Sequence, residues 1–338
     1  PSPRTAAHDA KQRSGDAGSV LVIPFIARRL AQLPLLLLAI FAVTFALAWL
    51  VPGNPLEQGD GRRPPPEIEK AMREQYRLDD PIAFATDYLA GASGIDWMRG
   101  RSERVFDLGP SLRQPDHSVN EILAAGLPVS LALGTAAILI GLAIGVAAGL
   151  CGGLRPDTRL DDLSQIVALV GISVPSFVVG SGLLLWLGVS WRVAPVAGWG
   201  GFSHVWLPAL ALSLPMAAYV ARLLRFGLIE QMSSDHIRTA RAKGRSRLGA
   251  AWHHAMRNAF LPVLSYLGPA AAAVLTGSFV IEKVFSIPGI GRHFVEAVLA
   301  KDLTLIMGVV LVYSSLLIVL NLAVDVLYRW VDPRIETG

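Results

Sequence analysis

Residues 235–262 read Asp-His-Ile-Arg-Thr-Ala-Arg-Ala-Lys-Gly-Arg-Ser-Arg-Leu-Gly-Ala-Ala-Trp-His-His-Ala-Met-Arg-Asn-Ala-Phe-Leu-Pro, a basic stretch between two apolar runs. Ser233 or Ser234 is suited to cap a short helix, and Gly244 is suited to end it in the left-handed conformation. Ser246 is suited to cap a second helix, in which apolar residues recur at helical spacing. These apolar residues are Leu248, Ala251, Trp252, Ala255 and Ala259. We therefore expect two short helices, joined at a glycine, that protrude between two membrane spans.

The rest of the chain has the composition of a membrane protein. Of its 338 residues, 53% are hydrophobic and 17% are charged, and its mean hydropathy is +0.49. A helix needs about 20 apolar residues to cross a bilayer, and six runs approach that length. They are Leu30–Val51, Leu127–Leu150, Ile166–Val189, Leu207–Ala221, Leu261–Ile281 and Leu305–Val324. We predict an all-α membrane protein with six transmembrane helices and a long extracytoplasmic insertion after the first helix.

The runs divide the chain into five parts. We expect a disordered N-terminal tail (1–20), a first transmembrane region (21–51), an extracytoplasmic insertion (52–126), a five-helix transmembrane core (127–330) and a C-terminal tail (331–338). The core contains the basic loop, at 226–260. Leu127-Pro128, Leu207-Pro208 and Leu261-Pro262 are expected to begin helices, since the first turn of a helix does not use the missing N–H of proline. Gly141, Gly145 and Gly149 predict close packing between helices, and we favour packing within the chain over a subunit interface.

Lysine and arginine side chains near the span ends predict the orientation. They gather before the first span, between the second and third, between the fourth and fifth, and after the sixth, whereas the opposite short loops hold few. Since cytoplasmic loops carry the excess of basic residues, both termini and the basic loop are expected in the cytoplasm. This topology accounts for the formal charge of +4. No basic patch interleaved with aromatic residues in a soluble domain points to nucleic acid.

The basic loop resembles a known motif. Arg238-Thr239-Ala240-Arg241-Ala242-Lys243-Gly244, followed by His254-Ala255-Met256-Arg257-Asn258-Ala259 and Leu261-Pro262, is similar to the coupling motif of ATP-binding-cassette importer permeases of the peptide and nickel group. The family's usual Glu-Ala-Ala opening is Arg238-Thr239-Ala240 in this chain, and His236 stands where tyrosine is more usual. The resemblance implies the type I importer permease fold.

Further segments resemble the same family in the same order. They are Arg28-Arg29-Leu30, Leu50-Val51-Pro52-Gly53-Asn54-Pro55, Glu74-Gln75-Tyr76-Arg77-Leu78-Asp79, Ser173-Val174-Pro175-Ser176-Phe177, Glu282-Lys283-Val284-Phe285-Ser286-Ile287-Pro288-Gly289-Ile290-Gly291, Asn321, Asp325, Tyr328 and Asp332-Pro333-Arg334. Asp107-Leu108-Gly109-Pro110-Ser111 and Val119-Asn120-Glu121-Ile122-Leu123 are similar to the longer outer segment of oligopeptide permease B-type subunits. The resemblance favours oligopeptides over dipeptides or nickel as the substrate.

The resemblance implies a transport subunit in the bacterial inner membrane that is worked by partners. The chain contains no Gly-x-x-x-x-Gly-Lys-[Ser/Thr] phosphate loop, so ATP and Mg are expected on two cytoplasmic ATPase subunits and no cofactor on this chain. A second, homologous permease subunit and an extracytoplasmic substrate-binding protein are the other expected partners. The residues implied in ATPase coupling are Arg238, Thr239, Ala240, Arg241, Lys243, Gly244 and Arg257.

Polar and helix-breaking residues in or near the spans are candidates for the translocation path or a gate. Pro175, with Ser173 and Ser176, is expected to kink the third span, either to line a cavity or as a structural bend. Glu282 and Pro288 belong either to a gate or to a solvated helix end. Asp325 is either functional or paired with Arg329, four residues on.

Other kinds of function find less support. A secondary transporter driven by an ion gradient would need ionisable residues in mid-span or paired broken helices, and the six runs carry almost no such charge. His253 and His254 are adjacent, so they do not converge on a metal as residues at i and i+4 would. No local catalytic motif is present, and we predict neither catalytic nor metal-binding residues.

Overall fold

The structure is a computed structural model that describes residue 29 and residues 31–57, 64–114 and 116–331. Five of its helices are long and apolar enough to cross a membrane, and a bent pair supplies a sixth crossing if it is counted as one span. The five are Ala31–Leu50, α5 (Val119–Leu154), α8 (Phe202–Met232), α12 (Leu261–Val284) and α14 (Leu303–Val331). The predicted all-α membrane fold is confirmed. The tail predicted at 1–20, and all but the first residue of that at 331–338, lie outside the described residues.

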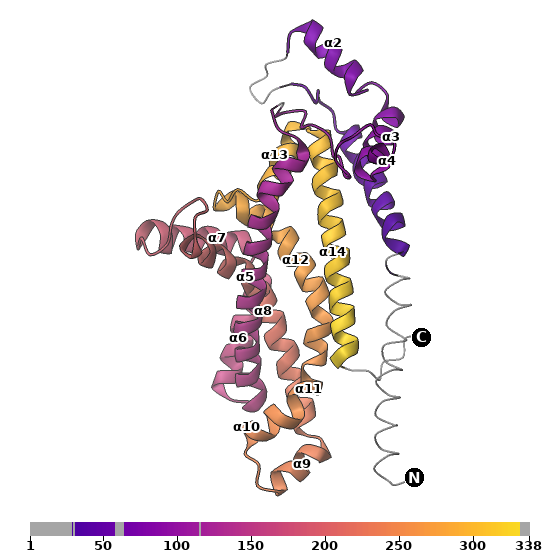
Figure 1. Ribbon diagram of the computed structural model, residues 1–338. Coiled ribbons are helices and arrows are strands. Elements are labelled where there is room, and N and C mark those ends of the chain that lie inside the picture. Colours follow the sequence, from indigo (N-terminus) through magenta and orange to yellow (C-terminus); the bar gives the residue numbers. More distant parts are fainter. Residues whose placement is uncertain (1–28, 30, 58–63, 115, 332–338) are drawn as a thin grey trace, which may run out of the picture.

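The long helices α5 and α8 pack along each other at the centre of the molecule (Figure 1). A Cβ atom added at Gly145 of α5 would lie 2.7 Å from the carbonyl oxygen of Ala217, and one added at Gly149 would lie 2.8 Å from that of Ala221. Any side chain at these positions would force the helices apart. The glycine row therefore serves packing within the chain, which is the role that we favoured from its spacing.

Two of the three Leu-Pro pairs do not begin helices, contrary to the prediction. α5 begins at Val119 and α8 at Phe202, so Pro128 and Pro208 both lie inside helices, whereas Leu261-Pro262 does begin α12. An internal proline loses one backbone hydrogen bond and is costly in a helix. For α5 a stronger start signal lies upstream of the proline.

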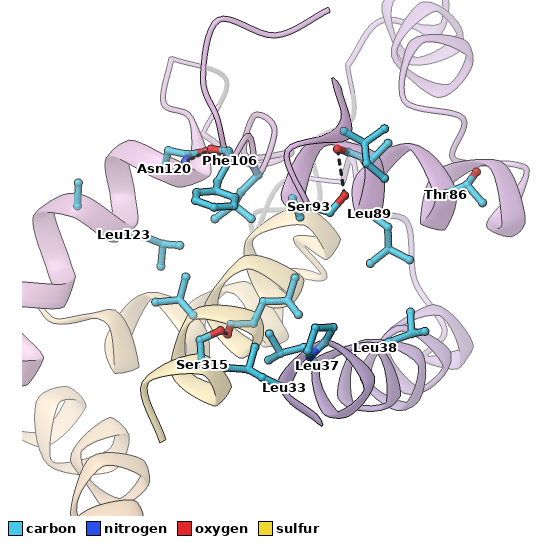
Figure 2. Close-up of a pocket in the computed structure, with 18 of the residues that line it drawn as sticks. Leu33, Leu37, Leu38, Thr86, Leu89, Ser93, Phe106, Asn120, Leu123 and Ser315 are labelled. Carbon is cyan, nitrogen blue, oxygen red and sulfur yellow. Dashed lines mark hydrogen bonds between the residues drawn. The ribbon is translucent and has the colours of Figure 1, made fainter. Parts of the chain in front are cut away.

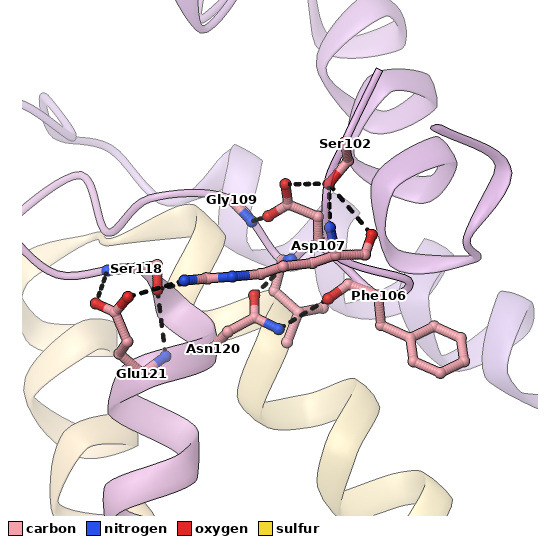
Figure 3. A network of polar contacts seen from close by, with 9 residues as sticks. Ser102, Phe106, Asp107, Gly109, Ser118, Asn120 and Glu121 are labelled. Carbon is pink, nitrogen blue, oxygen red and sulfur yellow. Dashed lines mark hydrogen bonds and ion pairs between the residues drawn. The ribbon is translucent and has the colours of Figure 1, made fainter. Parts of the chain in front are cut away.

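That signal is a capping box at Ser118. The Ser118 hydroxyl accepts a hydrogen bond from the backbone N–H of Glu121 at 3.3 Å, and the Glu121 carboxylate accepts one from the backbone N–H of Ser118 at 3.1 Å. Arg104 donates to the Ser118 hydroxyl at 2.8 Å and to the Glu121 carboxylate at 2.9 Å (Figure 3). Asn120 donates to the carbonyl oxygen of Phe106 at 2.8 Å. Hydrogen bonds and an ion pair thus join the insertion to the start of α5.

The third predicted span is broken rather than kinked. α6 (Arg159–Ser173) is followed by Val174, whose extended backbone conformation (φ −91°, ψ 124°) is the one that a following proline favours. Pro175 precedes α7 (Ser176–Leu183), which continues as the π-helical turn η1 (Leu184–Ser190). The two halves meet at a bend of 102°. Residues 176–190, which we call the side arm, project from the side of the bundle (Figure 1).

The insertion folds onto one end of the bundle. Its helices are α2 (Pro66–Gln75), α3 (Pro81–Ala92) and α4 (Ile95–Met98). The helix α13 (Ile290–Ala300) lies beneath the insertion (Figure 1). Buried Asp302, just before α14, accepts hydrogen bonds from the Ser111 hydroxyl at 2.5 Å and from the Arg113 backbone N–H at 3.3 Å. The Arg113 side chain donates to Ala300 O at 2.6 Å. Burial lowers the pKa of the Arg113 guanidinium, and Asp302 opposes this effect.

Candidate functional site

The basic loop between α8 and α12 folds into four short helical pieces at the end of the bundle opposite the insertion (Figure 1). They are α9 (Asp235–Ala242), α10 (Arg247–Ala250), the π-helical turn η2 (Ala251–Ala255) and α11 (Met256–Ala259). We call residues 233–260 the basic knob, since they contain six arginine or lysine residues and one aspartate. The two helical arms joined at a glycine are those that the sequence predicts.

The basic knob is fixed rigidly to the bundle. Ile237 of α9 is fully buried and belongs to the same core cluster as Leu228 of α8 and Ala255 of η2. A Cβ atom added at Gly227 of α8 would lie 2.6 Å from the carbonyl oxygen of Ala259, so α8 and α11 approach each other at backbone distance. A displacement of the basic knob would therefore move α8 and, through α11, the start of α12.

Gly244 joins the two arms of the basic knob. Its φ of +86° is in the left-handed region, where glycine alone has no steric penalty. The N–H of Arg245 donates to the carbonyl oxygen of Ala240 at 3.3 Å, which completes a glycine-based helix C-terminus of the Schellman type. Apart from its two chain neighbours, no atom of the described residues would lie within 4 Å of a Cβ atom at position 244. The first atom of a side chain there would therefore point into open space.

The surface of the basic knob carries the residues implied in coupling. Six of the seven are exposed and one, Ala240, is half-buried. The six are Arg238, Thr239, Arg241, Lys243, Gly244 and Arg257. Their role in coupling stays a prediction.

The basic knob also exposes two residues of the apolar stripe that the sequence predicts for its second arm. The apolar residues of its second arm divide, because Ala251, Ala255 and Ala259 are buried whereas Leu248 and Trp252 are each 61% exposed. Leu248 and Trp252 are four residues apart in consecutive helical turns, next to the basic side chains. Exposed tryptophan is enriched among the residues that dominate binding at protein interfaces.

Glu282, at the opposite end of the molecule, is a buried helix cap and not a solvated helix end. Its side chain has no exposed surface. The carboxylate accepts a hydrogen bond from the Ser130 hydroxyl at 2.7 Å and one from the backbone N–H of Arg292 at 3.2 Å. The Ser130 hydroxyl accepts from the N–H of Ile290 at 2.9 Å. Since Gly289 has no side chain with which to cap α13, Glu282 of α12 and Ser130 of α5 satisfy the orphan N–H groups of its first turn.

The comparison with protein families decides what kind of membrane protein this is. A family model described as "Binding-protein-dependent transport system inner membrane component" matches residues 137–337. The chain belongs to this family. The matched region runs from the middle of α5 to the C-terminal end, so it includes the side arm, the basic knob and the Glu282 cap of this transport component.

Curated relatives extend the match over most of the chain. The dipeptide transport system permease protein DppB of Bacillus subtilis (strain 168) is 37% identical over 92% of this chain and 97% of its own length. The oligopeptide transport system permease protein OppB of Salmonella typhimurium is 38% identical over 93% of this chain and its whole length. Among solved structures, the MetNI methionine ABC transporter in an inward-facing conformation gives a TM-score of 0.53 at 17% identity, over 62% of this chain and 96% of that chain. The MetNI likeness supports the fold alone.

The six candidate path or gate residues of this family member do not form one cluster. Ser173, Pro175 and Ser176 lie at the break between α6 and α7, and the Ser173 hydroxyl donates to the carbonyl oxygen of Leu169 at 2.8 Å. Glu282 lies in the last turn of α12, and exposed Pro288 lies between α12 and α13.

Asp325 lies far along α14 from the insertion and forms an ion pair with Arg29 at 3.4 Å. The side chain of Arg329, the partner expected from its spacing, lies outside the described residues. The pair joins the start of the first helix to the last helix of the chain.

One buried ion pair was missed by sequence reasoning. Arg225 of α8 donates to both carboxylate oxygens of Asp161 in α6, at 2.5 and 2.6 Å, and the two side chains are 11% and 1% exposed. The two partners are 64 positions apart in the sequence, so no local periodicity pairs them. In the described part of the chain, no group of three or more His, Cys, Asp or Glu side chains is placed to hold a metal ion.

Proposed function

We propose that this chain is the transmembrane permease subunit of an ATP-binding-cassette importer and forms half of a pathway for peptide uptake. Membership of the binding-protein-dependent family supports the importer, and the names of the dipeptide and oligopeptide relatives support the substrate class. The identities of the two kinds of relative are nearly equal, so the preference for oligopeptides rests on the resemblance of residues 107–123 to the longer outer segment of oligopeptide subunits.

The basic knob carries the proposal that partner ATPases drive transport. An exposed element fixed to the bundle through Ile237 and the Gly227–Ala259 contact is suited to transmit a movement of a docked partner to the spans. Trp252 and Leu248 offer an apolar anchor, and the arginines around them complement an acidic rim. In this proposal ATP and Mg bind to the ATPase subunits, and the chain itself performs no catalysis.

The side arm supports the proposal of a second permease subunit. It leaves the bundle at a steep angle, and its Phe177, Leu185 and Trp186 are 45%, 61% and 61% exposed. A projecting apolar element at membrane depth would gain contacts from a homologous chain packed on both sides of it. The two chains together would enclose the translocation path, with the break at Pro175 at their interface.

The orientation follows from the same proposal. The basic knob and both termini would face the cytoplasm of a bacterium, as the basic residues at the span ends predict. The insertion would then face outward, where a substrate-binding protein delivers the peptide. Its firm attachment through Asp302 and Arg104 suits a platform on which another protein lands.

The proposal is tested by purifying the tagged chain, in mild detergent, from the cells in which it naturally occurs. Mass spectrometry of the co-purifying proteins should identify a second permease, ATPase subunits and a binding protein, and the bound ligand should be a peptide. A variant that lacks the knob anchor, Trp252→Ala with Leu248→Ala, should lose the ATPases while it retains the second permease. Recovery of the chain alone, with transport driven by a proton or sodium gradient, would contradict the proposal and favour a secondary transporter.

A further inference from the structure

A cavity of about 1010 Å³ lies between the insertion and the membrane helices (Figure 2). The first helix contributes Leu33 and Leu37 to its walls, α5 contributes Leu123 and α14 contributes Leu311. The roof comes from the insertion, through α3, α4 and the loop that contains Phe106. Three walls therefore belong to helices that are long and apolar enough to span a bilayer, which places the cavity at membrane depth.

Almost all polar side chains in the lining of this cavity are hydrogen-bonded to other groups of the chain. The hydroxyls of Thr86, Ser93 and Ser315 donate to carbonyl oxygens of their own helices, at 2.9, 3.4 and 2.8 Å. The Asn120 side chain donates to Phe106 O and accepts from the Leu108 N–H. Arg99, at the end of α4, is the exception, because its guanidinium has no hydrogen-bond or ion-pair partner among the described residues. The lining contains no aspartate or glutamate.

The roof has the surface of a segment that rests on the membrane. Ile82 at the start of α3 is 76% exposed, and Trp97 and Met98 of α4 are 49% and 70% exposed. Phe106 is 61% exposed beside them. Tryptophan is enriched where the headgroups of a bilayer begin. This composition suits a segment at headgroup level, where Arg99 would lie between the apolar cavity and the polar headgroups.

We propose that this cavity binds a phospholipid of the surrounding bilayer. Its acyl chains would lie between the first helix, α5 and α14, and its phosphate would pair with Arg99. An amphiphile with an anionic head complements a cavity that offers apolar walls and a single unpaired cation at its rim. The bound lipid would fill the wedge between the first helix and the bundle and so hold the insertion against them.

A peptide is a poor match for the same cavity. Its backbone N–H and C=O groups would lose water without gaining partners, since the polar side chains of the lining are already hydrogen-bonded. A helix of a second permease chain would fill the apolar walls but would leave Arg99 without an anion. These two occupants are the alternatives that the experiment separates.

Native mass spectrometry of the purified full-length chain, with its associated subunits, tests the proposal after exchange into detergent with a defined mixture of phosphatidylglycerol and phosphatidylethanolamine. Ala124→Trp places a large side chain inside the cavity, because Ala124 is exposed and lines it. Ala125→Trp is the matched control, since the neighbouring Ala125 is also exposed but does not line it. Arg99→Gln removes the cation, and Arg101→Gln is its control outside the lining.

We expect the unmodified chain to retain phospholipid and Ala124→Trp to lose it. Arg99→Gln should weaken retention about tenfold, as expected for the loss of one charge-assisted hydrogen bond, and both controls should retain lipid as the unmodified chain does. Equal lipid retention by Ala124→Trp and Ala125→Trp would overturn the proposal. Loss of a second permease chain or of bound peptide from Ala124→Trp, with lipid unchanged, would overturn it as well and would identify the other occupant.

Discussion

Substitution of Gly244 by tryptophan should block the docking of a partner without unfolding the basic knob. Gly244 has a φ of +86°, so any residue with a Cβ atom is strained there, by about 1–2 kcal/mol. Alanine and tryptophan share this cost. The two variants differ only in bulk, and no described residue other than the chain neighbours has an atom within 4 Å of the added Cβ. We therefore expect the bulk of tryptophan to act mainly at an interface.

The size of the effect follows from the packing of interfaces. Forcing a large side chain into a closely packed contact costs about 1–3 kcal/mol, which corresponds to roughly 5- to 150-fold weaker binding. Affinity is measured between the chain in lipid nanodiscs and its purified ATPase subunit by fluorescence titration. ATP-dependent peptide uptake is measured in cells that express each variant, with the amount of chain in the membrane determined by immunoblot.

The controls separate docking from strain. Gly244→Ala should lose much less affinity than Gly244→Trp, and Gly244→Asn should be the mildest variant because asparagine tolerates the left-handed region. Gly100→Trp is the matched control outside the basic knob, since Gly100 has a φ of +68° and is equally open. The reasoning is refuted if Gly244→Trp binds the ATPase and supports uptake as well as Gly244→Ala does.

Three further predictions concern other parts of the molecule. Glu282→Ala should lower the thermal unfolding midpoint of the purified chain, because the Ser130 hydroxyl and the Arg292 N–H lose their acceptor, at a cost of about 1–3 kcal/mol. Glu282→Gln keeps one acceptor oxygen and should lower the midpoint less. The opposite order would be inconsistent with the cap. Asp161→Leu should destabilise the chain by roughly 3 kcal/mol, because Arg225 is left buried without its partner, and adding Arg225→Met should recover most of the loss; a double variant no better than the single would contradict this. Cys151 is the sole cysteine and is exposed near the C-terminal end of α5. A membrane-impermeant thiol reagent should therefore label the chain in inside-out vesicles but not in intact cells, with Cys151→Ser as the blank. Labelling of intact cells would contradict the proposed orientation.

The local pattern of residues was enough to predict the helical class and the shape of the basic knob. Long apolar runs predict helices because, within lipid, the backbone must satisfy its own hydrogen bonds. The Gly244 joint and the Ser246 cap depend on residues close together in sequence, and both lie where the pattern predicts them. These features need no knowledge of tertiary packing.

Features that depend on tertiary contacts were not predictable from the sequence. Pro175 was expected to kink a span, but how far the chain turns there depends on what α7 packs against. Glu282 was interpreted as a possible solvated helix end, whereas Ser130 from a distant helix buries it. The hydrogen bonds to Asp302 join segments about 190 residues apart, and no local periodicity marks such a pair.

The most direct test of the account is peptide uptake by the complete purified complex reconstituted in liposomes. With its binding protein on one side, the complex should take up labelled peptide only when ATP is supplied on the side that the basic knob faces. Gly244→Trp should abolish this uptake while the complex without ATP remains inactive. Peptide uptake driven by a proton or sodium gradient in the absence of ATP would contradict the central claim.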